Sequence, residues 1–286
     1  MKDPIIKYKR IIAVLSGLVV CLVISNFIVY NKLNIQSEDS LQVVELDNES
    51  AEIDDSLVTS DPVKTTSGTI VLVIDDFGYR NDSVSDGFLK LNVPITCAII
   101  PGHSQSRKFA EKALAKGKEI IIHMPMESSL NIKGEDDYKI KTGMTSEEIE
   151  WRINEVLKDM PEAIGMNNHQ GSKATTDGKV MSVVASVLKK NNKYFIDSRT
   201  SAKTVAEKVM RQIGVPTTRR HIFLDNDDSI EKISERLDEL VKLSRKQGVA
   251  VAIGHARPNT LKVLKDAIPQ LISDGYEFEF GSKVVD

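Results

Sequence analysis

The sequence predicts an α/β fold, a (β/α) barrel of about seven to eight strands that is similar to a TIM barrel but irregular. Three observations lead to this prediction. From Thr69 onward, short apolar runs alternate with helical patterns, an order typical of parallel sheets with right-handed crossovers. About eight such units occupy roughly 220 residues, which fits a barrel of the TIM type. Polar side chains stand at the ends of most apolar runs. An open doubly wound sheet is the alternative fold.

An apolar segment, residues 11–30, comes before the barrel and predicts a transmembrane helix, because it is long enough to cross a bilayer. The basic residues ahead of it place residues 1–10 in the cytoplasm as a short tail. The rest of the chain is then expected outside the cytoplasm, at the cell surface or in the periplasm. A cleaved signal peptide is the alternative, but no typical small-residue cleavage site follows Tyr30.

Residues 31–67 form an acidic stretch without aromatic residues, which predicts a flexible linker to a domain at residues 68–286. The net charge of −3 gives no indication of a nucleic-acid partner. No glycine-rich phosphate-binding motif follows the first strand, so no nucleotide partner is expected either. Cys21 and Cys97 lie in separate apolar runs, and no disulfide is expected between them.

The first expected strand, Thr69–Asp75, is the element around which the domain is organised. Its unbroken β-branched run is typical of a strand buried on both faces. The run ends on Asp75 and Asp76, at the edge of a parallel sheet where active sites lie. Adjacent carboxylates repel each other, so they need a metal ion, a shared proton or basic partners. The alternative is that one caps the next helix while the other is solvated.

The remaining elements follow in the expected alternation. Further strands are predicted at Ile95–Ile100, Glu119–His123, Ala163–Asn167, Tyr194–Asp197, His221–Leu224, Val249–Ile253 and Tyr276–Phe280. Helices are predicted at Ser104–Lys116, Thr145–Met160, Asp177–Lys190, Ser201–Ile213, Asp228–Gln247 and Asn259–Ser273. Thr145 and Glu148 have the spacing of a capping box, which supports the start of the second helix.

Histidines gather at the ends of these strands: four of the five in the chain, His103, His123, His169 and His255, stand there. The strand ends of a barrel meet on one face, so these residues are expected to be neighbours. One carboxylate and two imidazoles form a three-ligand site that suits Zn²⁺ or a similar divalent ion. Together with Asp75 and Asp76, His123, His169 and His255 supply ligands, a proton acceptor and a proton donor for metal-assisted hydrolysis, whereas His103, in a turn after Pro-Gly, is either a rim residue or a ligand.

Six other polar residues stand near the strand ends, and the sequence leaves their roles open. Asp197 and Asp225 either orient catalytic histidines or cap the helices that follow them. Arg199 either binds an anionic group or pairs with Asp75 or Asp197, and the pairing is favoured. Glu127 either coordinates the metal, binds substrate or faces solvent, whereas Asn167 and Asn168 are expected to hold the loop around His169 or to contact substrate.

Six motifs resemble those of the divergent polysaccharide deacetylases, a branch of the NodB-like superfamily. They are IDDFG at 74–78, HMPME at 123–127, NNHQGS at 167–172, IDSRTS at 196–201, FLDN at 223–226 and GHARP at 254–258. The resemblance extends over about residues 69–285. It implies a zinc-containing barrel in which Asp75 is the catalytic base, His255 the catalytic acid and Asp76 a metal ligand.

The chain departs from the ordinary NodB-type pattern at the metal histidines. Ordinary members take both from one H-x-x-x-H motif, whereas here Glu127 occupies the position of the second histidine after His123. The resemblance then implies that His169 supplies the second imidazole.

The expected function is metal-dependent hydrolysis that removes N-acetyl groups from an extracytoplasmic polysaccharide by cleaving a carbon–nitrogen amide bond. Its expected partners are an acetylated polysaccharide and, through the N-terminal helix, the membrane. Two alternatives stay open. The domain could be an inactive or weakly active glycan-binding or scaffold module of the cell envelope, or it could hydrolyse an ester or phosphoester.

Overall fold

The structure is a computed structural model, and it describes residues 66–130 and 135–286, which belong to one compact unit, Val63–Asp286. The expected cytoplasmic tail (1–10), membrane helix (11–30) and almost all of the linker (31–67) lie outside the described residues. Within the described part, no helix combines the length and the apolar character that crossing a membrane requires.

The described residues form nine strands in one sheet. The strands are β1 (Gly68–Phe77), β2 (Thr96–Ile99), β3 (Glu119–Met126), β4 (Gly165–Gln170), β5 (Tyr194–Asp197), β6 (Thr217–Arg219), β7 (Ile222–Phe223), β8 (Val249–His255) and β9 (Tyr276–Glu279). The helices are α2 (Ser83–Leu89), α3 (Ser106–Ala115), α4 (Ser146–Asp159), α5 (Gly178–Lys190), α6 (Ala206–Ile213), α7 (Ile230–Gln247) and α8 (Pro258–Ser273), with short 3₁₀ turns at Ala174–Thr176 and Gly281–Lys283.

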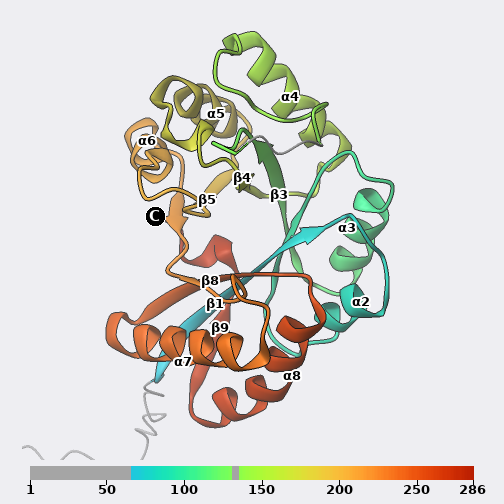
Figure 1. Ribbon diagram of the computed structural model, residues 1–286, viewed down its shortest axis with the longest axis vertical. Helices are drawn as coiled ribbons and strands as arrows, with labels where there is room; N and C mark the ends of the chain where they lie inside the picture. Colours follow the sequence, from blue (N-terminus) through green and yellow to red (C-terminus); the bar gives the residue numbers. More distant parts are fainter. Residues whose placement is uncertain (1–65, 131–134) are drawn as a thin grey trace, which may run out of the picture. The chain divides into compact units, whose positions relative to one another are not determined.

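Every strand pairs with its neighbours in parallel, and Figure 1 shows the helices around the outside of the curled sheet. The strand order is β6-β5-β4-β3-β2-β1-β8-β7, with β9 beside β1. This confirms the predicted parallel α/β fold of the TIM type. The edge strands β6 and β7 do not pair with each other in the described part, so the sheet curls without closing.

Two elements differ from the sequence prediction. Strand β6 raises the number of strands to nine, and helix α2 lies between β1 and β2 where no helix was expected. Strand β6 is only three residues long and reads Thr-Thr-Arg, so it lacks the apolar run by which the other strands were found. The capping box of α4 is confirmed, because Thr145 Oγ1 accepts from Glu148 N and Glu148 Oε2 accepts from Thr145 N.

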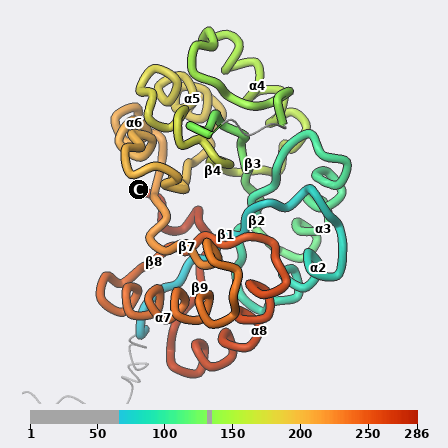
Figure 2. The backbone as a smooth tube through the Cα atoms, in the orientation of Figure 1, coloured from blue at the N-terminus to red at the C-terminus, as the bar shows by residue number. Residues whose placement is uncertain are grey.

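Strand β1 pairs with three other strands. It pairs with β8 along Thr69–Asp75 on one side. On the other side it pairs first with β9 and then with β2. Figure 2 shows this arrangement, in which β1, near the start of the described chain, lies beside β8 and β9, near its end. Residues Ile70 to Ile74 are at most 1% exposed, which confirms the prediction of a strand buried on both faces.

Alternate residues of β1 serve two separate cores. Ile70, Leu72 and Ile74 pack with the helices in the outer core. Val71 and Val73 belong to the inner core, which is made of strand residues such as Ile121, Ile196, Val251 and Ile253. The inner face of each strand leads directly to the polar end of the sheet. Residues with the same alternation, including Asp75, His123 and His255, continue this inner face at the strand ends.

Candidate metal centre

The two consecutive acids reach the same site because β1 is irregular at its end. The β1–β2 pairing shifts register between Ile74 and Phe77, as it does at a β-bulge. Asp76 has φ 67°, a left-handed conformation that turns its side chain back to the inner face beside Asp75. Gly78 then turns the chain with φ 111°, and a Cβ there would lie 2.9 Å from Ile100 O. The IDDFG motif is therefore a bulge followed by a turn that only glycine fits.

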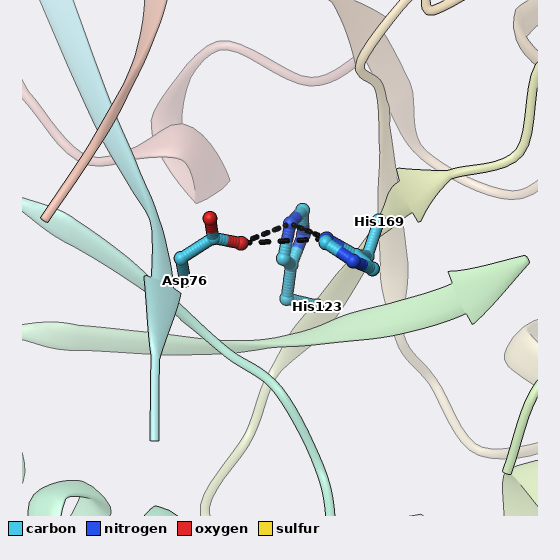
Figure 3. A group of neighbouring side chains, drawn as sticks. All are labelled: Asp76, His123 and His169. Carbon is cyan, nitrogen blue, oxygen red and sulfur yellow. Dashed lines mark hydrogen bonds and ion pairs between the residues drawn. The ribbon is translucent and has the colours of Figure 1, made fainter. Parts of the chain in front are cut away.

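Asp76, His123 and His169 form a compact three-residue cluster from β1, β3 and β4 (Figure 3). Asp76 Oδ1 lies 3.4 Å from His123 Nε2 and 3.3 Å from His169 Nδ1. The two imidazole nitrogens are 3.1 Å apart. All three side chains point to one spot. The structure therefore brings together the three residues that the sequence proposed as ligands.

The cluster fits a divalent cation. Tetrahedral bonds of about 2.0–2.1 Å to nitrogen and oxygen place neighbouring ligand atoms about 3.3 Å apart, close to the observed separations. Asp76 Oδ1 is buried and has no hydrogen-bond partner among the described residues. A buried carboxylate oxygen whose neighbours are two imidazole nitrogens is stabilised by a positive charge, either a bound cation or a protonated histidine.

Asn167 of β4 joins the cluster to Asp75. Its Oδ1 lies 2.6 Å from His123 Nδ1, and its Nδ2 donates to Asp75 Oδ1 at 2.8 Å. Because an amide oxygen only accepts, this bond places the proton of neutral His123 on Nδ1 and leaves the Nε2 lone pair facing Asp76 and His169. The sequence suggested that Asn167, at the end of its strand, holds the loop around His169; in the structure it is instead the register partner of His123 and contacts that side chain.

Glu135 holds the far side of His169. Its Oε2 lies 3.3 Å from His169 Nε2, and its Oε1 accepts a hydrogen bond from Tyr79 Oη. Burial lowers the pKa of His169, but the carboxylates of Asp76 and Glu135 outweigh it and raise that pKa to about 9. The two carboxylates therefore favour a positive charge between them. Glu135 lies in the β3–α4 loop, where no sequence pattern indicates a function.

Replacing Glu135 by glutamine should weaken zinc binding about 10–100-fold, because ligand histidines depend on the carboxylates that orient them. The measurement is a competition titration of zinc against a chromophoric chelator. Asp136→Asn is the matched control, since Asp136 is the exposed neighbour and pairs with Lys141 instead. Equal affinities for Glu135→Gln and the wild type would contradict the role of Glu135.

Asp75 and His255 are register neighbours on β1 and β8, and both adjoin the cluster. Asp75 is 3% exposed. Burial raises the pKa of its carboxyl group, and this effect is larger than the lowering by His123 and His255. Its Oδ2 lies 3.5 Å from His123 Nε2. His255 Nε2 lies 3.8 Å from Asp76 Oδ2. Asp75, which can accept a proton, and His255, which can donate one, therefore lie beside the same three-residue cluster.

Asp225 orients His255. Its Oδ1 lies 2.8 Å from His255 Nδ1, and its Oδ2 accepts from His255 N at 2.7 Å and from Thr260 Oγ1 at 2.6 Å. Burial lowers the pKa of His255, but the Asp225 carboxylate outweighs it and raises that pKa. The carboxylate also directs the free Nε2 of the ring toward the cluster.

Asp197 and Glu127 do not contact His123, His169 or His255. Asp197 Oδ1 accepts from Arg199 N at 2.8 Å, and its Oδ2 accepts from Thr204 Oγ1 at 2.9 Å, so the side chain holds the turn after β5. Glu127 Oε1 pairs with Lys173 Nζ at 2.8 Å, and its Oε2 accepts from Thr142 N at 2.7 Å. Both carboxylates therefore fix loops.

Asn168 and Arg199 line a cavity beside the cluster. Asn168 Oδ1 accepts from Ser198 N at 3.0 Å, which ties the loop after β5 to β4. The pairing expected for Arg199 is absent, since its guanidinium forms no ion pair with Asp75, Asp197 or any other carboxylate of the described chain. The reason is local: Asp197 bonds to the backbone of Arg199, whose φ of 50° belongs to a tight turn.

Residues 72–285 match the family model of the divergent polysaccharide deacetylases. An uncharacterized protein of Haemophilus influenzae is 37% identical over 205 residues, which cover 72% of each chain. The uncharacterized protein YibQ of Escherichia coli is 34% identical over 218 residues, covering 76% of this chain and 67% of its own.

Two solved structures have a similar fold. The uncharacterized protein ATU2773 of Agrobacterium tumefaciens has a TM-score of 0.71 at 17% identity, covering 77% of this chain and 90% of its own. The catalytic domain of a peptidoglycan N-acetylglucosamine deacetylase from Eubacterium rectale has a TM-score of 0.51 at 14% identity, covering 74% of this chain and 87% of its own. At such identities the likeness concerns the fold alone. The match of the family model over most of the chain decides the identity: this protein belongs to the divergent polysaccharide deacetylase family.

Proposed function

We propose that the protein is a metal-dependent hydrolase that removes N-acetyl groups from a polysaccharide outside the cytoplasm. One observation carries the proposal: the three-ligand cluster is adjoined by a buried carboxylate, Asp75, and by an imidazole, His255, that is held by a carboxylate of its own. Membership of a deacetylase family supports N-acetylated sugar as the substrate. The apolar segment 11–30 supports a membrane-anchored, extracytoplasmic enzyme.

Zinc is the cofactor that Asp76, His123 and His169 suit best, and a bound zinc ion would polarise the acetyl carbonyl and lower the pKa of a nearby water. Asp75 accepts a proton from the attacking water, whose oxygen forms a bond to the acetyl carbon. His255 donates its Nε2 proton to the amide nitrogen as the carbon–nitrogen bond breaks. The products are acetate and a free amine on the sugar.

Asn167 and Asp225 hold the reacting side chains in the protonation states and orientations that the reaction needs. Asn167 fixes the His123 tautomer and holds one oxygen of Asp75, which leaves the other for the proton transfer. Asp225 favours the protonated imidazole of His255. A carboxylate whose pKa is raised by burial is also a better proton acceptor than a solvated one.

The test is acetate release by the purified, zinc-loaded full-length chain on a panel of N-acetylated glycans, beside Asp75→Asn. Asparagine keeps the shape of aspartate, and residue 75 is not one of the three expected metal ligands. The zinc content should therefore stay unchanged. Acetate release should fall about 10²–10⁴-fold, the usual contribution of a general base. If the zinc-loaded wild type binds a glycan but releases no acetate, and Asp75→Asn retains the glycan equally, the glycan-binding or scaffold alternative would be favoured.

A further inference from the structure

A cavity of about 380 Å³ adjoins the candidate centre and contains a positive region that the proposed reaction does not use. The cavity is lined on one side by His123 and His169 of the three-residue cluster and by their neighbours Asp75 and His255. Arg199 and Arg220, from the loop after β5 and the end of β6, line another part. Both arginines are half-buried.

Neither guanidinium forms an ion pair within residues 66–130 and 135–286. Arg220 is held in place by neutral groups: its Nε donates to Ser198 O at 2.7 Å, and its Nη2 donates to Arg199 O at 3.0 Å. The ring of Phe223 lies under its guanidinium at 4.9 Å. Five other arginines of the described chain pair with carboxylates, namely Arg80, Arg107, Arg211, Arg219 and Arg236, whereas Arg152, Arg245 and Arg257 form no ion pair there either.

Unpartnered polar groups lie in the same wall. Ser198 is 5% exposed and lines the cavity, and its Oγ has no hydrogen-bond partner among the described residues. Gln170 also lines the cavity, and its Oε1 is buried without a partner in the same part of the chain. Buried polar atoms are rarely left unsatisfied, so their presence beside two arginines that form no ion pair in the described chain indicates a ligand site.

We propose that Arg199 and Arg220 form a subsite for an anionic group of the glycan, a carboxylate or a phosphate ester next to the acetylated sugar. This proposal rests on the hydrolase function proposed above, because it names the class of its substrate. The planar guanidinium matches the two oxygens of such a group, and the Ser198 hydroxyl supplies a further donor. A neutral glycan would leave both guanidinium groups without an ion-pair partner in the described chain.

The experiment measures binding, so it is independent of turnover. Calorimetric titrations on the zinc-loaded full-length chain with Asp75→Asn compare a hyaluronan tetrasaccharide, which carries carboxylates and N-acetylglucosamine, with the same tetrasaccharide after reduction of its carboxyl groups. N-acetylglucosamine 6-phosphate and N-acetylglucosamine form the phosphate pair. At least one acidic ligand should bind about tenfold more tightly than its neutral counterpart. The pair with the larger ratio identifies the anionic group.

Adding Arg199→Gln to the same background should abolish that preference, while Arg236→Gln, on the exposed face of α7, should leave it unchanged. Equal affinities within both pairs would overturn the subsite, as would a preference that survives Arg199→Gln. An Arg199-dependent preference in a protein that releases no acetate would support the subsite and contradict the hydrolase. Equal acetate release from acidic and neutral glycans, with no preference in binding, would support the hydrolase and contradict the subsite.

Discussion

Replacing Asp76 by alanine is expected to remove the metal and, with it, acetate release. The wild type should contain about one zinc ion per chain, since three ligands with an open position are the usual catalytic zinc set. Asp76→Ala, His123→Ala and His169→Ala should each contain almost none. Zinc at a hundredfold excess over its dissociation constant stabilises a protein by about 2.7 kcal/mol. Added zinc should therefore raise the melting temperature of the wild type but not of these variants.

Metal analysis by mass spectrometry and thermal melts with and without zinc provide the two measurements. His103→Ala is the matched control, because it also removes an imidazole near the site. The His103 ring packs on Tyr79 and lies 3.9 Å from Glu135, away from the three ligand atoms. It should keep the ion. If His169→Ala binds zinc as tightly as the wild type, the ligand assignment is wrong.

Replacing Asp225 by asparagine is expected to lower kcat about 10²–10⁴-fold with little change in KM, as in histidine–carboxylate pairs of other hydrolases. The amide keeps the shape of the side chain but loses the charge that favours protonated His255. Zinc content should stay at the wild-type level because Asp225 does not contact the three ligands. Steady-state acetate release gives kcat and KM.

The pH profile separates this role from a loss of structure. Asp225 raises the pKa of His255, so the wild type keeps the acid form to higher pH than Asp225→Asn does. The alkaline limb of kcat should therefore move to lower pH in the variant. A bound cation lowers the pKa of His255 in the wild type and in Asp225→Asn alike. The pKa of His255 should therefore still be lower in the variant than in the wild type. Asp227→Asn, at an exposed residue two positions later, should leave the limb in place. An unmoved limb in Asp225→Asn would contradict the assignment.

The sequence predicted the elements that have a strong apolar pattern. All eight expected strands are present, and β1 is buried from Ile70 to Asp75. The ninth strand, β6, was not predictable because its pairing with β5 depends on the fold and not on its own Thr-Thr-Arg sequence. Helix α2 is short, and its start is fixed by Asp82, which accepts from Val84 N and Ser85 N.

The alternation of strand residues explains which site residues were predictable. His123 lies two positions after Ile121, and His255 lies two positions after Ile253. Residues two apart share a strand face, so both histidines lie on the inner face and reach the site. The same alternation places Ile196 inward and Asp197 outward, which is why Asp197 holds a turn instead of orienting a histidine. Asp76 breaks the alternation through the bulge, and Glu135 comes from a loop, so neither position follows from strand periodicity.

The left-handed backbone of Asp76 also limits how the metal preference of the site can be changed by engineering. At φ 67°, aspartate and asparagine are tolerated far better than most side chains. Exchanging the hard carboxylate for the soft thiolate of cysteine would therefore meet a backbone penalty before any question of coordination arises. Redesign toward thiophilic ions has to begin at another ligand or flatten the bulge first. In this site, the backbone torsion φ of Asp76 restricts which metal ions a single ligand substitution can favour.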